Sequence, residues 1–444
     1  MKTFRIGGVH PNDNKIYSAH KQITEVPLPK KAVIPLVQHI GAPAKALVVK
    51  GDKVKVGQLI AEAGGFVSAN IHSPVSGTVT KVDSTVDAWG LRMPAIFIDV
   101  EGDEWMPEID RSNELNTICK LEAKEIIEKI KAAGIVGLGG ACFPTHVKLM
   151  PPPGKKAEVL VVNGVECEPY LTCDHQLMLE KGEEIMVGIQ ILMRALDIKK
   201  AVIGIENNKT DAIELMQKLS SRYLGVSVEP LKLRYPQGGE KQLIDACISR
   251  QVPSGALPIE VGAVVDNVAT IFAVYEAVQK NKPLISRVMT VTGKDVKNPG
   301  NYSVRFGTPL SEVLEFAGGI PQSTGKIIGG GPMMGRAMNN VDMPTNKRVS
   351  GVLMLTKEES YRKEPSACIR CAKCVSACPM GLEPYLLSKL AALSRFDEME
   401  KHNVMDCIDC GCCQFTCPSN RPLLDYIRMG KAQVGANIRA RAQK

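Results

Sequence analysis

The chain has 444 residues, 44% of them hydrophobic and 23% charged, and its formal net charge is +8. That length accommodates about three domains of the usual size. No apolar run of about 18 residues exists and no apolar stretch follows Met1, so we expect neither a membrane-spanning helix nor a secretory signal. Without such a signal, the 14 cysteines indicate a reducing cytoplasm and metal or redox sites. No basic stripe with interleaved aromatic residues is present, which argues against a nucleic-acid partner.

Residues 1–105 are predicted to form a small β domain, because short apolar runs alternate there with Gly, Pro and Asp. Two phrases in it, KGDKVKVGQLI and HSPVSGTVTKV, resemble the barrel-sandwich fold of biotinyl and lipoyl carriers. A carrier needs a lysine between those phrases, and the stretch from Glu62 to Ile71 contains none. We therefore expect a docking or scaffold role for this domain rather than a swinging cofactor arm.

Residues 115–285 alternate between predicted strands and helices, which is typical of a Rossmann-like α/β domain with a mostly parallel sheet. The expected elements are strands at 157–164, 199–206 and 226–233, helices at 121–133 and 211–219, and a strand, turn and helix at 260–278. Polar clusters follow these strands, at the sheet edge where such domains bind ligands. The glycines of GLGGACFP lack a Cβ and permit close approach of the backbone to a bulky ligand.

Four segments of this domain carry a specific resemblance: GLGGACFPTHVK, NGVECEP, YPQGGEK and VVDNVAT. In this order they are similar to the segments that build the FMN and NADH pocket in the flavoprotein subunit of respiratory complex I. The resemblance implies a non-covalently bound FMN, with NAD(H) as the substrate. The cofactor-binding residues that it implies are Gly137, Gly139, Gly140, Phe143, Lys148, Asn163, Glu166, Gly238, Gly239, Glu240, Asp266, Asn267 and Thr270.

The resemblance also implies roles for these residues. Lys148 would line the flavin and its phosphate together with the glycines of GLGG, and Asn163 would lie beside the isoalloxazine and ribityl chain. Phe143 and Glu168 would face the nicotinamide nucleotide, and Glu166 and Glu168 would be the catalytic pair. The sequence departs from that family at Leu138, where Arg is usual, and at Gly239, where the first of two Glu residues is usual. These departures keep open a second hypothesis, a non-catalytic electron-transfer and docking module.

Residues 286–340 resemble the β-grasp (SLBB) domain that follows the flavin domain in the same family. They contain a strand, a loop, a helix over 309–317 and the phrase GKIIGGGPMMG. That phrase lacks the Lys-Ser/Thr of a P-loop, so we exclude a nucleoside triphosphate site. Residues 341–366 are expected to form a linker with one short strand.

Residues 367–430 carry a duplicated cysteine motif, CIRCAKCVSACP from Cys368 and CIDCGCCQFTCP from Cys407. Each is C-x2-C-x2-C-x3-C-P, the spacing of two-cluster ferredoxins, in which the fourth cysteine binds the other [4Fe–4S] cluster. Zinc sites use four ligands and do not need eight cysteines in this duplication. One predicted ligand set is Cys368, Cys371, Cys374 and Cys417, and the other is Cys378, Cys407, Cys410 and Cys413. Cys412 lies outside the spacing and is predicted to be a spare thiol.

The residues between and after the motifs complete an α-helical ferredoxin domain. Residues 383–402 are predicted to form one helix, which indicates a helical rather than a minimal two-cluster ferredoxin. The tail, 431–444, is basic and expected to be mobile, and it suits docking on an acidic partner.

The order of the domains, together with the N-terminal phrases GGVHP and QHIGAP, is similar to the RnfC family, the peripheral NADH-side subunit of the Rnf ferredoxin:NAD oxidoreductase. This resemblance implies electron transfer between the clusters, FMN and NAD(H), coupled to Na+ or H+ translocation by partner subunits. It implies the Rnf membrane subunits and the other iron–sulfur subunit as partners, ferredoxin as an indirect one, and a peripheral place on the cytoplasmic membrane face. An NADH-dependent cobalamin reductase, which shares the flavin and cluster parts, remains the alternative enzyme.

Overall fold

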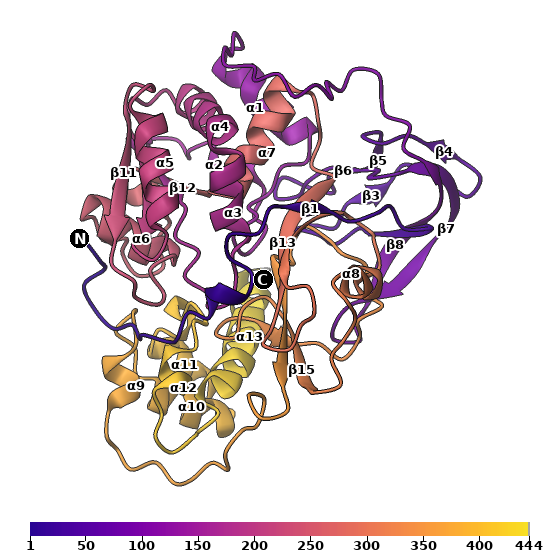
Figure 1. Cartoon of the computed structure of the whole chain (residues 1–444). Coiled ribbons are helices and arrows are strands. Elements are labelled where there is room, and N and C mark those ends of the chain that lie inside the picture. Colours follow the sequence, from indigo (N-terminus) through magenta and orange to yellow (C-terminus); the bar gives the residue numbers. More distant parts are fainter. Residues whose placement is uncertain (443–444) are drawn as a thin grey trace.

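The computed structural model describes residues 1–442, which fold into four units (Figure 1). The N-terminal β domain and the α/β domain lie on opposite sides, a mixed β domain lies between them, and a helical domain lies below. Within the described part of the chain, no helix is long and apolar enough to cross a membrane.

The N-terminal domain is a sandwich of two antiparallel sheets over one apolar core. The larger sheet has the order β2-β8-β7-β4, with β2 Lys31–Pro35, β8 Arg92–Gly102, β7 Ser76–Val86 and β4 Lys53–Val54. The smaller sheet has the order β3-β5-β6, with β3 Lys45–Ala46, β5 Leu59–Glu62 and β6 Ile71–His72. Ile34 and Ile96 of the first sheet and Ile60 and Ile71 of the second meet in the core.

The α/β domain is built on a four-stranded parallel sheet, as predicted. Its order is β11-β10-β9-β12, with β11 Val226–Leu231, β10 Ala201–Glu206, β9 Val159–Asn163 and β12 Ala263–Asn267. Strand β9 is apolar throughout because both faces are covered: Leu160 and Val162 face one core, and Val159 and Val161 face the other. Such runs without alternation are typical of parallel strands buried on both sides.

Seven helices accompany this sheet. Helix α6 Glu240–Ile248 covers one face. The other helices are α1 Ala123–Ala132, α2 Thr145–Lys148, α3 Cys173–Glu180, α4 Gly182–Ala195, α5 Thr210–Ser220 and α7 Val268–Gln279, and a 3-10 turn spans Pro258–Val261. Helices α4 and α7 pack closely, since Gly188 of α4 lies against Ile271 of α7 with no space for a Cβ.

The mixed β domain has one six-stranded sheet and one covering helix, α8 Leu310–Phe316. The order is β1-β14-β13-β17-β15-β16, with β1 Thr24–Glu25, β14 Gly300–Arg305, β13 Ser286–Thr292, β17 Gly351–Thr356, β15 Thr324–Gly329 and β16 Arg336–Ala337. Strand β17 lies within the segment 341–366, which the sequence predicted to be a linker with one short strand. Its pairing with β13 and β15 makes it an inner strand instead, because its apolar residues complete the core.

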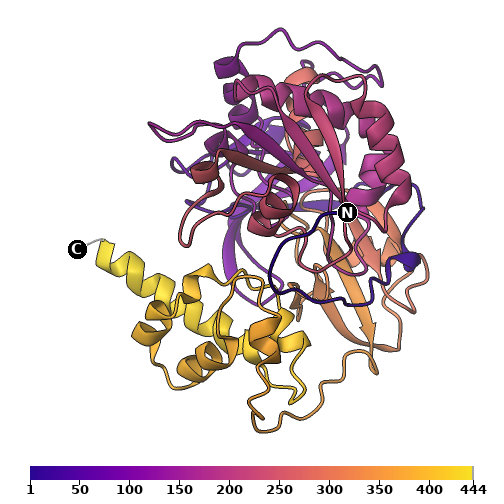
Figure 2. The same ribbon diagram turned by 90° about the vertical axis from the view of Figure 1, so that its left-hand side faces the viewer.

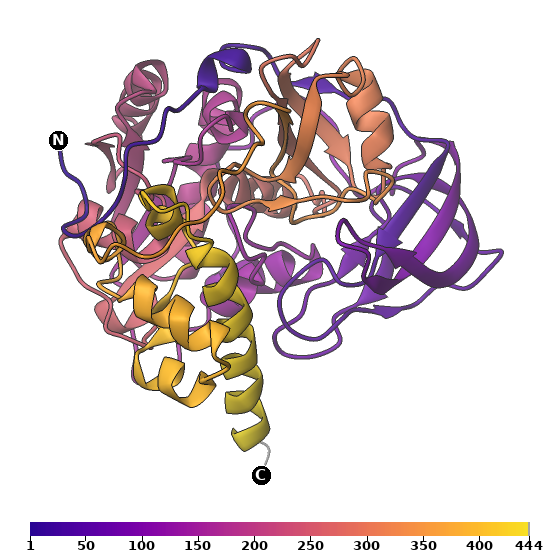
Figure 3. The same cartoon turned by 90° about the horizontal axis from the view of Figure 1, so that it is seen from below.

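The helical domain corrects two predictions. Its helices are α9 Lys373–Ser376, α10 Pro384–Ala392, α11 Phe396–Lys401, α12 Cys412–Phe415 and α13 Leu423–Ala442, with a 3-10 turn at Val404–Asp406. The single helix expected at 383–402 is two helices, because Ser394 adopts a left-handed backbone with φ 54°. The tail expected to be mobile continues α13 to Ala442, because Ile427 and Val434 pack into the domain core. Figure 3 shows this helix extending past the other helices. Residues 443–444 of that tail lie outside the described residues.

The first 25 residues form an extended arm across the other domains (Figure 2), with one 3-10 turn at Lys15–Tyr17. In the GGVHP phrase, the amide of Gly8 donates to the carbonyl of Ala377 in the helical domain at 2.9 Å. The next residue, Val9, exchanges two 2.9 Å backbone hydrogen bonds with Tyr235 of the α/β domain. The arm ends as β1, which pairs with β14. It therefore ties three domains together.

Candidate functional site

Asn163 and Asn267 end two neighbouring strands, and the parallel register pairs them at the carboxyl edge of the sheet. Asn267 caps α7, since its Oδ1 accepts from the amide of Ala269 at 2.9 Å, and its Nδ2 donates to Asp174 Oδ2 at 2.7 Å. Asn163 Nδ2 donates to the carbonyl of Gly238 at 2.9 Å. Three of the four predicted segments therefore meet at this edge.

The fourth segment, the glycine loop of residues 137–140, lies over the junction of β12 and α7. The amide of Leu138 donates to the Thr270 hydroxyl at 2.8 Å. A Cβ added to Gly139 would lie 2.8 Å from the side chain of Asn267, so only glycine permits this approach. The loop therefore contacts Asn267 and Thr270, two residues that the sequence predicted to bind the same ligand.

The glycine loop presents free backbone donors to open space. Gly139 and Gly140 are exposed, and no carbonyl among residues 1–442 accepts from their amides. A Cβ on Gly140 would meet nothing within 4 Å. Phe143 is half-buried beside the loop, and its carbonyl accepts from the amide of Gly137 at 2.9 Å. Free amides over a polar sheet edge fit the phosphate and ribityl chain of FMN.

Glu166 and Asp174 form a carboxyl pair at the same edge. Glu166 has a left-handed backbone with φ 45°, and its carboxylate accepts from the amides of Asp174 at 2.8 Å and His175 at 3.2 Å, where α3 begins. Burial, followed by the negative charge of Glu166, raises the pKa of Asp174 above its usual value. The sequence analysis did not select Asp174, although it lies in the polar stretch after β9 that contains Glu166.

Lys148 is engaged with acidic residues. Its Nζ donates to the carbonyl of Val265 at 2.7 Å and lies 3.7 Å from carboxylate oxygens of Asp266 and Glu240. Asp266 is buried, neither of its oxygens has a hydrogen-bond partner among the described residues, and burial raises its pKa to about 6. The three predicted residues Lys148, Asp266 and Glu240 therefore lie close together, and the charge of Lys148 faces two carboxylate groups. Gly239, the other departure, is the N-cap of α6.

Glu168 lies away from this group, at a junction of three domains. Its Oε2 accepts from the amide of Met333 at 3.1 Å and its Oε1 from the amide of Met334 at 2.8 Å, both in the GGGPMMG phrase. The Tyr235 hydroxyl lies 3.2 Å from Glu168 Oε1 and 2.9 Å from the carbonyl of Cys410. Burial raises the pKa of Glu168. Both oxygens therefore join the α/β domain to the loop of the mixed domain, and the Tyr235 hydroxyl makes the contact with the second cysteine motif.

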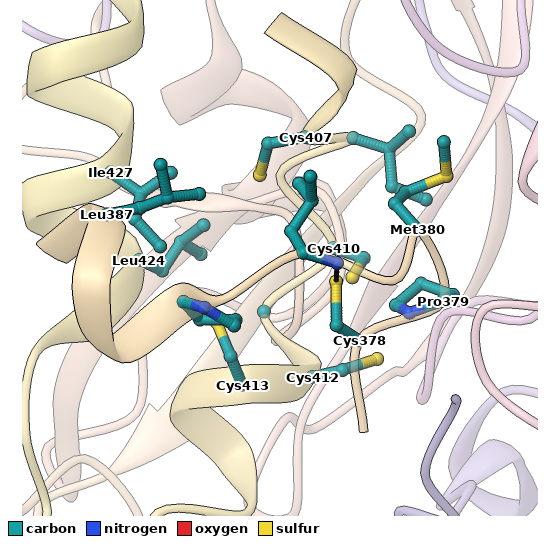
Figure 4. A pocket seen from close by; sticks show the side chains of 14 residues that line it. Cys378, Pro379, Met380, Leu387, Cys407, Cys410, Cys412, Cys413, Leu424 and Ile427 are labelled. Atoms are coloured by element: carbon teal, nitrogen blue, oxygen red, sulfur yellow. Dashed lines mark hydrogen bonds between the residues drawn. The ribbon is translucent and has the colours of Figure 1, made fainter. Parts of the chain in front are cut away.

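Four predicted cluster ligands line one cavity (Figure 4). Cys407, Cys410 and Cys413 come from the second motif, and Cys378 comes from the first. The rest of the lining is mostly apolar and includes Pro379, Met380, Leu387, Leu424 and Ile427. Four thiols in an apolar shell fit a [4Fe–4S] cluster, whose ligands are cysteine thiolates. Cys412 also borders the cavity, and its Sγ is hydrogen-bonded to the carbonyl of Tyr235 at 3.9 Å.

The other four cysteines lie at the surface. Cys368 and Cys371 are exposed, whereas Cys374 and Cys417 are partly buried. Cys374 of the first motif and Cys417 of the second both pack against the core of the helical domain, and burial raises the pKa of Cys374.

The two motifs repeat the same backbone turns. Arg370 and Asp409, which are equivalent, have φ 56° and 57°, and Ala372 and Gly411 have φ 58° and 78°. Each motif then enters a four-residue helix, α9 or α12. The two cysteine motifs therefore repeat in backbone conformation as well as in sequence, and this repetition suits two similar clusters.

Comparison with protein families gives four matches that follow one another along the chain. Residues 2–103 match the RnfC barrel sandwich hybrid domain, 130–276 the Nuo51 FMN-binding domain, 288–337 the SLBB domain and 360–418 the 4Fe-4S dicluster domain. These matches confirm the predicted fold classes and the predicted cofactors, FMN and [4Fe–4S] clusters.

Similar proteins extend over the whole chain, and each is named as one component of an oxidoreductase complex. The relative from the proton-translocating ferredoxin:NAD(+) oxidoreductase complex of Clostridium ljungdahlii is 46% identical over 98% of this chain and 94% of its own length. The relative from the Na(+)-translocating complex of Acetobacterium woodii is 43% identical, over 98% of each chain. The relative from the ion-translocating oxidoreductase complex of Rhodobacter capsulatus is 41% identical over 98% of this chain and 84% of its own length. The chain therefore belongs to the RnfC family of ion-translocating ferredoxin:NAD(+) oxidoreductase complexes.

Proposed function

We propose that this chain is the peripheral subunit of a membrane-bound ferredoxin:NAD+ oxidoreductase and passes electrons between NAD(H), FMN and two [4Fe–4S] clusters. Partner proteins of the complex couple this transfer to translocation of Na+ or H+, the ions that appear in the names of the relatives. One observation carries the proposal: Tyr235 is the first residue of the YPQGGEK segment of the flavin domain and also contacts the backbone of Cys410. A flavin-type site and a cluster cavity are thereby joined within one chain.

The residues at the sheet edge act as the binding surface for the flavin. FMN bound here would supply the conversion between the hydride of NADH and single electrons, which neither nicotinamide nor an iron–sulfur cluster performs. The amides of Gly139 and Gly140 would hold its phosphate, and Asn163 and Asn267 would lie along its polar chain. Burial and the negative charge of Glu166 favour the protonated form of Asp174 at the same edge, because they raise its pKa. The remaining predicted contacts are Gly137, Phe143, Lys148, Gly238, Gly239, Glu240, Asp266 and Thr270.

Glu168 takes a positioning role in this proposal. Its two hydrogen bonds to the GGGPMMG phrase fix the flavin domain against the mixed β domain, and its contact with Tyr235 supports the residue that reaches the second motif. The cluster of Cys378, Cys407, Cys410 and Cys413 then lies next to the flavin domain. The cluster of Cys368, Cys371, Cys374 and Cys417 is farther out, with two exposed ligands.

The exposed cluster suits exchange with partner proteins. We propose the other iron–sulfur subunit of the complex as its immediate partner, with ferredoxin feeding it indirectly, and the membrane subunits as the anchor on the cytoplasmic face. The N-terminal sandwich has no predicted carrier lysine in its hairpin and serves as scaffold or docking surface.

The proposal is tested by assaying the purified chain, reconstituted anaerobically, for NADH oxidation with an artificial acceptor and with cob(III)alamin. We expect retained FMN and NADH oxidation with the artificial acceptor, without preference for cobalamin. A marked preference for cob(III)alamin supports the reductase alternative instead. A preparation with full iron content but no retained FMN supports the non-catalytic electron-transfer module.

A further inference from the structure

A buried arginine from the mixed β domain reaches the glycine loop of the flavin domain. Arg287 belongs to β13 and is only 6% exposed. One terminal nitrogen of its guanidinium donates to the carbonyl of Leu138 at 3.0 Å, and the other donates to the carbonyl of Lys347 at 2.6 Å. Its Nε donates to the carbonyl of Val288 at 3.3 Å. Every contact is therefore with a neutral carbonyl.

The positive charge of Arg287 has no ion-pair partner within 4.0 Å among residues 1–442. Lys347 beside it is also buried: its Nζ donates only to the carbonyls of Gly134 at 2.7 Å and Asn70 at 3.1 Å, and burial lowers its pKa to about 7. A buried charge without a counterion is costly, and it is normally paired. A buried guanidinium without an ion-pair partner behind the glycine loop indicates that an anion completes the site.

The contact with Leu138 also fixes the direction of the loop. In a trans peptide, the carbonyl and the following N–H point in opposite directions. Because Arg287 holds the Leu138 carbonyl on the buried side, the Gly139 N–H is turned to the exposed side. The neighbouring Gly140 also borders open space, since an added Cβ there would have no atom within 4 Å.

We infer that Arg287 is a positioning residue for the flavin phosphate: it orients the Gly139 amide towards the phosphate and supplies the positive charge behind the loop. This inference rests on the proposed FMN site. It extends that site into the mixed β domain, because Arg287 lies outside the segment 130–276 that matches the FMN-binding domain. A flavin without phosphate gains little from this arrangement, so Arg287 should favour FMN over riboflavin.

The experiment measures the affinities of the full, cluster-reconstituted chain, with its flavin removed, for FMN and for riboflavin by fluorescence quenching. Wild type is compared with Arg287→Met, which removes the charge and the donors, and Arg287→Lys, which keeps the charge. The matched control is Arg305→Lys on the neighbouring strand β14, since Arg305 donates instead to the carbonyl of Pro74 and to Asp103. Circular dichroism verifies that each variant is folded.

We expect Arg287→Met to weaken FMN binding at least about tenfold, the scale of one lost charge-assisted interaction, and to change riboflavin binding much less. Arg287→Lys should fall between it and wild type, and Arg305→Lys should match wild type. An equal loss for both flavins, or no loss for either, overturns the inference while leaving the flavin site in place. A wild-type chain that binds neither flavin contradicts the proposed function as well.

Discussion

Cys378 is the residue that makes the two cysteine motifs one unit. Its side chain lines the cavity of the second motif, although it belongs to the first. We predict that Cys378→Ser perturbs the EPR signal of the second-motif cluster and that Cys371→Ser perturbs the other signal, because a serine hydroxyl is a poor ligand for iron in a cluster. Reduction of the flavin by NADH should persist in both variants.

Cys412→Ser is the control for these substitutions. Cys412 is fully buried at the same cavity, but it is outside the ligand spacing, so both signals should remain. If Cys378→Ser and Cys371→Ser change the same signal, the ligands are not crossed and the assignment is wrong.

Asp266 is a buried carboxyl group that should make the flavin-free chain less stable at high pH. Burial raises its folded-state pKa to about 6 from 3.8, so the folded state holds the proton more tightly than the unfolded state. The group is neutral in both states below about pH 4, and its burial penalises the folded state fully above about pH 6. The difference corresponds to about 3 kcal/mol.

We therefore predict that Asp266→Asn raises the free energy of unfolding at pH 8, by up to about that amount, and leaves it nearly unchanged at pH 4. Denaturant titrations at the two pH values measure this. Asp99→Asn, at an exposed position, is the control for loss of one charge. Equal effects of Asp266→Asn at both pH values would count against the argument.

The cysteine spacing predicts eight cluster ligands, and the polar residues that follow the strands could be located from the sequence because they directly follow apolar runs. Asp174 was accessible in principle, since it follows Glu166 in one polar stretch. Arg287 and the contacts of Glu168 were not, because both depend on which distant loop packs against them. The spacing of residues along the sequence does not show which distant loops pack against each other.

The N-terminal arm is one of the elements that hold the helical domain against the flavin domain. Gly7 has φ 68°, and a Cβ there would lie 2.4 Å from the backbone of Cys378. We predict that Gly7→Ala displaces the arm and slows reduction of the clusters by NADH, while reduction of the flavin keeps its rate. Stopped-flow absorbance, which follows both chromophores, is the measurement.

Gly51→Ala is the matched control. Gly51 also has a positive φ, of 98°, but a Cβ there meets nothing within 4 Å. The two variants share the cost of a left-handed alanine, roughly 1 kcal/mol, and only Gly7→Ala adds the clash. Similar slowing in both variants would mean that the arm contact does not matter.

Elements with strong periodicity were predicted well, and elements that depend on partners were not. Strands β9 and β10 and helices α1 and α5 match the predicted positions because their apolar patterns are unambiguous. The short strand expected within 341–366 is β17, but its apolar pattern does not reveal that it pairs with β13 and β15 as an inner strand. The basic residues of α13 favoured the prediction of a mobile tail, although Ile427 and Val434 of this helix are buried in the domain core.

At the scale of the whole molecule, the domains are arranged so that one junction serves both redox sites. Tyr235 contacts the second cysteine motif, and Glu168 contacts the GGGPMMG phrase. Val9 of the N-terminal arm pairs with Tyr235. The order of domains predicted all four units. It could not predict that their contacts converge on one tyrosine, since this depends on how the domains pack.

The central claim is that this single chain connects NADH to both clusters through its flavin. The most direct measurement is an anaerobic NADH titration of the reconstituted chain, followed by flavin absorbance and by EPR of the clusters. We predict that NADH bleaches the flavin, that EPR signals of reduced clusters follow, and that removal of the flavin abolishes both. The claim is contradicted if dithionite reduces the clusters while NADH reduces neither flavin nor clusters, or if NADH reduces the clusters equally well without flavin.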